Sequence, residues 1–207
     1  YKNDTKKLVK YERLTLEYHQ GNFQVKGTRV GIGIFDLCSR QSDNSISVKR
    51  KKELTGRSWP NGCHVAEVEI DAETGEVRLD RYVSVDDVGN TVNPMIVHGQ
   101  VQGGIASGLG QAVLERTEYD ASGQLLSGSY MDYALPRADD MPSLSGSLFE
   151  KAPCLTNPLG AKGTGEIGAV AGPPAIVHAV IDALAEKGIT QVDMPLQPQK
   201  IWECLNR

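Results

Sequence analysis

Residues 64–77 read His-Val-Ala-Glu-Val-Glu-Ile-Asp-Ala-Glu-Thr-Gly-Glu-Val. Polar and apolar residues alternate over 64–70, which is typical of a strand with one buried face. Residues 71–75 supply a turn with a glycine, and a second strand follows over 77–85. The segment therefore predicts an antiparallel hairpin, the clearest one in the chain.

The N-terminal part of the chain predicts a second hairpin. Strands over 14–18 and 23–26 flank His-Gln-Gly-Asn at 19–22, which is a good turn sequence. Residues 2–12 are charged and weakly helical, and residues 36–60 are polar and irregular. We therefore divide the chain into an N-terminal segment, 1–60, and a C-terminal domain, 61–207.

A glycine-rich helix is predicted after the large hairpin. Asn93 and Pro94 are typical of an N-cap and a first helical residue, and the helix runs to about Glu115. Each interior glycine costs ~1 kcal/mol relative to alanine. Helical spacing places small residues on one face and apolar residues on another. The small residues are Gly99, Gly103, Ala106 and Gly110, and the apolar residues are Val97, Val101 and Ile105. We expect another backbone to pack closely against the small-residue face.

The C-terminal half mixes short strands and helices. The predicted elements are a turn at 121–123, a strand near 144–151, a helix opened by Pro173 and Pro174 and running to Lys187, a strand over 189–193 and a helix over 198–205. Strands and helices do not alternate as regular βαβ units, so the predicted fold class is α+β.

The composition is that of an ordinary globular protein. Among 207 residues, 40% are hydrophobic and 23% are charged, with a net charge of −4. The negative charge argues against a nucleic-acid partner or an anionic membrane surface. The longest apolar stretch, 169–184, is interrupted by Gly, Pro, His and Asp, so no membrane span is predicted. The first residue, Tyr1, is not methionine, which suggests a fragment.

Four scattered cysteines exclude a metal site built from closely spaced thiolates. No Cys-x-x-Cys pair occurs, so a local zinc or iron–sulfur cage is not expected. Reduced thiols and a cytoplasmic location are the default for such a protein, with two disulfides as the alternative. His98 and His178 have no partner at metal-ligand spacing and are interpreted as structural.

The loop Gly-Thr-Gly-Glu-Ile-Gly at 163–168 fits the Gly-x-Gly-x-x-Gly pattern of dinucleotide-binding loops. Such a loop follows a strand directly and opens an uninterrupted helix. Residues 157–162 make a poor strand, Pro173 and Pro174 follow within six residues, and only fourteen residues come after Asp193. We therefore reject a dinucleotide site.

Glu166 in this loop is a candidate general base. A carboxylate can serve as a base when a dry pocket tunes its pKa, and flanking glycines let a ligand approach. The alternative is a solvated loop residue, and Lys162 either pairs with Glu166 or lies on the surface. Gln100, near the start of the glycine-rich helix, offers two donors and one acceptor to a ligand, or is an exposed polar residue. Asp86 and Asp87 are expected to complement the N-terminus of that helix rather than to bind a cation.

Taken in order, several strings resemble the C-terminal part of the molybdenum-binding subunit of the xanthine dehydrogenase, aldehyde oxidase and aerobic carbon monoxide dehydrogenase family. They are 64–77, Asp-Val-Gly-Asn-Thr-Val-Asn-Pro at 87–94, Gly-Gln-Val-Gln-Gly-Gly at 99–104, Gly-Leu-Gly at 108–110, Tyr-Ala-Leu-Pro at 133–136, Asp-Met-Pro at 140–142 and Gly-Ala-Lys-Gly-Thr-Gly-Glu at 160–166. The resemblance covers about residues 60–206, and residues 1–60 match more loosely.

The resemblance implies a molybdenum hydroxylase that adds a water-derived oxygen to a carbon centre. In the family, the glutamate at the position of Glu166 is the general base, and the glutamine at the position of Gln100 contacts the cofactor. Gly99, Val101 and Gly165 would approach the cofactor through their backbone. The implied cofactor is molybdopterin, with the cytosine dinucleotide form as one option, and no metal ligand is assigned to this chain.

The family's other cofactor loops are absent here, as are its iron–sulfur cysteines and flavin module. The implied partners are therefore an upstream molybdopterin-binding half and iron–sulfur and flavin subunits or domains. The substrate is a small molecule, and a purine, an aldehyde, an N-heterocycle and carbon monoxide all remain open. The alternative function is a non-catalytic module that packs within a multi-subunit oxidoreductase.

Overall fold

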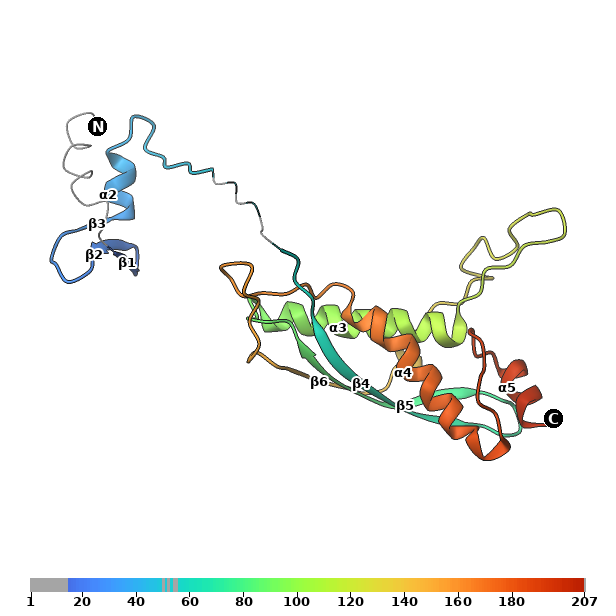
Figure 1. Cartoon of the computed structure of the whole chain (residues 1–207). Helices are drawn as coiled ribbons and strands as arrows, with labels where there is room; N and C mark the ends of the chain where they lie inside the picture. Colours follow the sequence, from blue (N-terminus) through green and yellow to red (C-terminus); the bar gives the residue numbers. More distant parts are fainter. Residues whose placement is uncertain (1–14, 50, 52, 54–55, 207) are drawn as a thin grey trace. The chain divides into compact units, whose positions relative to one another are not determined.

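The computed structural model describes residues 15–49, 51, 53 and 56–206, and these form two compact units (Figure 1). The first unit spans Tyr1–Glu53 and the second Leu54–Arg207. Strands and helices occur in both, which confirms the α+β class. The helix predicted over 2–12 lies outside the described residues. The proposed domain boundary at 60 stays a prediction.

The first unit is built on the predicted N-terminal hairpin. Strand β1 (Leu16–His19) pairs antiparallel with β2 (Asn22–Val25), and β2 pairs with β3 (Gly31–Gly33). The two turn residues, Gln20 and Gly21, both have positive φ (46° and 84°), as tight hairpin turns require. A short helix, α2 (Ile34–Ser39), follows. The irregular structure predicted over 36–60 is therefore wrong at 36–39, whereas the described residues from 40 to 60 are irregular as predicted.

The second unit contains a three-stranded sheet in the order β4-β5-β6. Strands β4 (Asn61–Ile70) and β5 (Val77–Asp87) form the predicted large hairpin. Strand β6 (Leu144–Leu148) pairs parallel with β5, and it is shorter than the predicted strand over 144–151.

A β-bulge changes which β5 side chains are buried. Glu67 pairs with Arg81 and Val68 with Leu79, so Asp80 is an extra residue in β5. The bulge shifts the period-two alternation by one. The buried positions are Val77 and Leu79 before the bulge, and Tyr82, Ser84 and Asp86 after it.

Helix α3 (Pro94–Leu109) begins where the sequence predicted. The Asn93 side chain caps it by accepting a hydrogen bond from the backbone N–H of Ile96 (3.2 Å). A π-helical turn, η1 (Gly110–Leu114), continues it to the predicted end. A last helix, α5 (Pro198–Leu205), also has the predicted bounds.

Helix α4 (Ile167–Ala183) begins six residues earlier than predicted. Pro173 and Pro174 lie inside it rather than at its start. Each proline removes one backbone donor, but the helix continues because its apolar face is buried, with Ile176 and Val180 fully enclosed. The proline argument against a dinucleotide site was therefore wrong. The absence of a preceding strand still excludes that site, since residues 157–162 form no strand in the structure.

Helices α3 and α4 pack through glycines, but not those of the predicted face. A Cβ on Gly168 would collide with the carbonyl of Val101, and a Cβ on Gly108 would lie 3.0 Å from Gly172 Cα. By contrast, no described heavy atom lies within 4 Å of a Cβ built on Gly99 or Gly103. The close contact of α3 with α4 thus uses Gly104 and Gly108. These glycines lie on a face of α3 next to the predicted one, since Gly104 directly follows Gly103.

The core lies between this helix pair and the sheet, and α4 contacts β4 directly (Figure 1). Buried residues come from β5, α3, η1, α4 and α5, together with Leu184, Val192 and Leu196. The predicted strand over 189–193 is wrong, because this segment is irregular in the structure. Val192 packs into the core without pairing to a strand. No helix among the described residues has the length and apolar character that crossing a membrane requires.

Candidate functional site

Glu166 lies at the N-cap position of α4, with backbone angles φ −116° and ψ −2°. Its carbonyl accepts the first helical hydrogen bond from Val170 (2.9 Å), whereas its carboxylate makes no capping bond. The side chain is exposed. The carboxylate is therefore free of the local bond that most often occupies an acidic residue at a helix start.

Gln100 lies in the second turn of α3 and is also exposed. A Cβ built on Gly165 would lie 4.0 Å from Gln100 Oε1, so the amide reaches the loop that carries Glu166. The glycine packing of α3 on α4 explains this meeting, because it fixes the start of α4 beside the first turns of α3. The structure thus places the Gln100 amide beside Gly165, the residue that directly precedes Glu166.

Gly99 and Val101 face in different directions. Gly99 is exposed, whereas Val101 is only 3% exposed and belongs to the core. The Val101 carbonyl faces Gly168 of α4. The roles that the sequence analysis gave these two residues stay predictions, and only Gly99 presents an open backbone.

Three glycines of α3 and of the loop that carries Glu166 have open space where a side chain would lie. No described heavy atom lies within 4 Å of a Cβ placed on Gly99, Gly103 or Gly163. Gly99 and Gly103 lower the stability of α3. Among the described residues, no packing contact accounts for glycine at these two positions. An exposed glycine backbone can instead be approached closely by a ligand.

Lys162 does not pair with Glu166. Its Nζ lies 2.6 Å from Asp87 Oδ2, and the two side chains are only 11% and 12% exposed. Lys162 is therefore neither paired with Glu166 nor a surface lysine. Its partner, Asp87, was not among the alternatives drawn from the sequence. The structure also corrects the expectation for Asp86 and Asp87, which engage other side chains while Asn93 caps α3.

A buried polar network lies on the helix-facing side of the sheet and was missed by the sequence analysis. His64 Nε2 lies 2.9 Å from Asp86 Oδ1, and His64 Nδ1 lies 2.9 Å from the Tyr82 hydroxyl. The Ser84 hydroxyl donates to Asp86 Oδ2 (2.9 Å). Every donor is satisfied when Tyr82 donates to a neutral His64 and His64 donates to an ionised Asp86. Burial, and then the charge of Asp86, raise the pKa of Tyr82.

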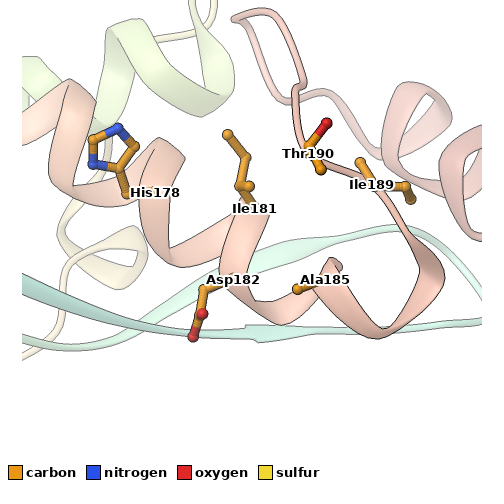
Figure 2. Close-up of a pocket in the computed structure, with 6 residues that line it drawn as sticks. All are labelled: His178, Ile181, Asp182, Ala185, Ile189 and Thr190. Carbon is orange, nitrogen blue, oxygen red and sulfur yellow. The ribbon is translucent and has the colours of Figure 1, made fainter.

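A pocket of about 320 Å³ lies at the other end of α4 (Figure 2). His178, Ile181 and Asp182 come from α4, and Ala185, Ile189 and Thr190 from the segment that follows. Figure 2 shows His178 and Asp182 pointing in different directions, so the polar groups do not converge. None of the candidate site residues lines this pocket.

Comparison with a protein-family model decides the family. The model of the molybdopterin cofactor-binding domain matches residues 3–142. The chain belongs to the molybdopterin cofactor-binding family. This match includes Gln100 and ends before Glu166, and it confirms the family resemblance drawn from the sequence motifs.

Curated relatives of this molybdopterin cofactor-binding chain extend the match further. The gamma subunit of the 6-hydroxypseudooxynicotine dehydrogenase complex of Paenarthrobacter nicotinovorans is 33% identical over 196 residues, which is 90% of this chain and 25% of that protein. The carbon monoxide dehydrogenase large chain of Hydrogenophaga pseudoflava is 37% identical over 148 residues, 72% of this chain and 18% of that protein. The chain thus spans a quarter or less of these relatives.

Solved structures show the same fold. Quinoline 2-oxidoreductase from Pseudomonas putida 86 matches with a TM-score of 0.82 and 32% identity, covering 93% of this chain and 26% of that chain. Carbon monoxide dehydrogenase from Oligotropha carboxidovorans matches with a TM-score of 0.81 and 29% identity, covering 91% and 24%. The fold is therefore that of one part of a large molybdenum enzyme subunit.

Proposed function

We propose that this chain forms part of the large subunit of a molybdenum hydroxylase, which oxidatively hydroxylates a small molecule with water as the oxygen source. The observation that carries the proposal is the meeting of Gln100 with the Glu166 loop on one open, glycine-lined surface. Purines, aldehydes, N-heterocycles and carbon monoxide are candidate substrates. Relatives named for carbon monoxide, hypoxanthine, nicotine and quinoline support this range.

The chain's own residues fit one side of a molybdopterin site. Gly99 and Gly165 offer backbone that a ligand can approach, and the Gln100 amide supplies directional hydrogen bonds. When bound, the cofactor supplies a two-electron oxidant for the substrate. The cytosine dinucleotide form is one option for its organic part.

Glu166 acts as the general base in this proposal. The carboxylate accepts a proton at Oε from the water-derived oxygen nucleophile as that oxygen attacks the substrate. Gln100 donates a hydrogen bond to the cofactor and holds it in register with the carboxylate. Exposure of Glu166 in this chain means that the water-excluding walls of the site come from elsewhere in the subunit.

The partners in this proposal are the remaining part of the molybdenum subunit and the iron–sulfur and flavin subunits or domains that carry electrons away. The relatives' names describe a complex subunit and large chains, which supports assembly with other polypeptides. The short coverage of those relatives supports a site completed by further sequence.

The test is Glu166→Gln in the parent complex, which means the full-length molybdenum subunit assembled with its companions. A purine, an aldehyde, an N-heterocycle and carbon monoxide are each assayed as substrates. We expect turnover to fall at least ~100-fold, since a positioned base contributes about 10²–10⁴-fold, while the molybdenum content stays unchanged. Glu186→Gln, an exposed carboxylate after α4, is the matched control. Full turnover in Glu166→Gln would refute the catalytic assignment.

A packing module is the second candidate function. Val92 and Met95 at the start of α3 are each 77% exposed, and Leu155 is 94% exposed. Exposed apolar groups of this kind favour contact with another polypeptide. If the packing role is the whole function, Glu166→Gln and Gln100→Ala leave turnover unchanged, whereas charged residues at Val92 and Met95 prevent assembly.

A further inference from the structure

The loop that carries Glu166 crosses the segment that directly follows β5 and is hydrogen-bonded to that segment. The backbone N–H of Lys162 donates to the carbonyl of Val88 (2.8 Å), and the N–H of Asn90 donates to the carbonyl of Gly160 (2.9 Å). These two bonds join segments about seventy residues apart in sequence and make a short antiparallel crossing. The backbone just before Glu166 is therefore fixed to the segment that continues from β5.

The crossing is too tight for side chains on its two glycines. Gly89 and Gly160 have φ values of 64° and 68°, in the left-handed region that favours glycine. A Cβ on Gly89 would collide with the Gly160 carbonyl, and a Cβ on Gly160 would lie 2.6 Å from Asn90 Nδ2. The same Asn90 amide donates to the carbonyl of Leu159 (2.9 Å). The glycines of the two segments thus allow the two backbones to approach each other closely at this point.

The ion pair between Lys162 and Asp87 locks the crossing. Lys162 Nζ lies 2.6 Å from Asp87 Oδ2, and Asp87 Oδ1 accepts from the backbone N–H of Gly89 (2.9 Å). Burial alone would raise the pKa of Asp87, but the hydrogen bonds from Lys162 and Gly89 and the Lys162 charge hold it below its ordinary value. Both side chains are almost enclosed, so solvent screens this pair far less than an exposed one.

A second anchor lies just after Glu166. Gly168 packs against Gly104 and Val101 of α3, since a Cβ on Gly168 would meet their backbone atoms. Only Gly163, Thr164 and Gly165 separate Lys162 from Glu166. The Glu166 carboxylate is thus carried by a short glycine-rich segment that is fixed at both ends. Loss of either fixed point would make that segment more mobile.

We propose that Lys162 and Asp87 are positioning residues, which act through the 163–165 backbone to hold the Glu166 carboxylate beside Gln100. The inference rests on the proposed role of Glu166 as base. Neither positioning residue touches the reacting atoms in this arrangement. Their effect is to restrict where the carboxylate can be, and misplacement of a catalytic group by about 1 Å can cost ~100-fold in rate.

The test uses Lys162→Met and Asp87→Asn, with two readouts. In the 207-residue chain, hydrogen exchange of the amides of residues 163–167 is expected to accelerate about 10-fold or more, while amides of β4 stay protected. In the parent complex, kcat is expected to fall by about 10–100-fold with KM changed less than ~2-fold, as for other supporting residues of catalytic groups. Lys162→Arg keeps the charge and is expected to recover most of both readouts.

Arg81→Met is the matched control, because it breaks the exposed pair between Arg81 of β5 and Glu67 of β4 (3.6 Å) and should change neither readout. Unchanged exchange at 163–167 in both test variants would overturn the inference. So would an unchanged kcat in a complex where Glu166→Gln abolishes turnover. If Glu166→Gln itself leaves turnover intact, the proposed function fails instead, and the exchange result then shows separately whether the ion pair holds the loop. If Lys162→Met fails to fold, the test of the inference rests on Asp87→Asn, in which the new side chain is nearly isosteric with the native one.

Discussion

At the scale of single residues, motif order in the sequence identified Gln100, Gly165 and Glu166 as candidates, and the structure places the Gln100 amide beside Gly165. Their catalytic and cofactor roles stay predictions. The Lys162–Asp87 ion pair and the buried hydrogen-bond network of His64 could not be predicted from the sequence. Lys162 and Asp87 are 75 residues apart, and nothing local indicates that they meet.

The buried hydrogen-bond network of His64 could not be predicted for a different reason. Val77 and Leu79 point into the core, and regular alternation from them would have placed Val83 and Val85 inside. The extra residue Asp80 reverses the alternation. Ser84 and Asp86 are buried for that reason, and a bulge of this kind leaves no reliable mark in the sequence.

Tyr82 gives a prediction for the pH dependence of stability. Its pKa is raised in the folded chain from the ordinary value of 10.0. Above that pH, an unfolded Tyr82 releases its proton while the folded one keeps it, so the unfolded state is favoured. The contribution of Tyr82 is therefore complete below the ordinary tyrosine pKa and declines as the pH rises above it.

Urea unfolding at neutral pH and at a pH above the ordinary tyrosine value measures this decline. Tyr82→Phe should lower the free energy of unfolding at neutral pH by about 1–3 kcal/mol, because His64 Nδ1 loses its partner. The same variant should show a smaller loss of stability on raising the pH. Tyr119→Phe, on an exposed side chain, is the control, and an equal pH response in Tyr82→Phe and wild type would contradict the assignment.

At the scale of elements, most helices and strands of the second unit were predictable. The hairpin of β4 and β5, the N-cap of α3 and the bounds of α5 follow from alternation, capping and proline position. The start of α4 was not predictable by these means, because burial of its apolar face outweighs the loss of two backbone donors. The face of α3 that packs was also misjudged, since glycines are found on several sides of that helix.

The glycines of α3 and α4 give a matched pair of substitutions. Gly168→Ala should destabilise the chain by at least 1–3 kcal/mol, because the added Cβ meets Val101 and Ile105 backbone atoms that cannot move aside alone. Gly103→Ala, where no described atom is within 4 Å, should stabilise it by about 0.5–1 kcal/mol through helix propensity.

Thermal and urea unfolding of the 207-residue chain measure the change in stability caused by each substitution. The account predicts shifts of opposite sign for the two alanine variants. Equal shifts would mean that α3 and α4 do not meet at Gly168, and the placement of Glu166 beside Gln100 would lose its support.

At the scale of the whole molecule, we propose that the chain provides one side of a site. Gln100 and Glu166 are exposed on it, and the aligned part of the chain covers only 25% and 18% of the two relatives compared. We therefore predict that the isolated 207-residue chain binds no molybdopterin. Molybdenum and pterin are measured in the purified chain, with the full-length subunit as control. Stoichiometric cofactor in the isolated chain would show that its site is complete.

The central claim is that Glu166 takes the proton in the chemical step. The most direct measurement is the rate at which substrate reduces molybdenum in a single turnover of the parent complex, compared between wild type and Glu166→Gln at equal molybdenum content. The account predicts a rate at least ~100-fold lower in the variant, with substrate affinity nearly unchanged. Reduction at the wild-type rate would contradict it.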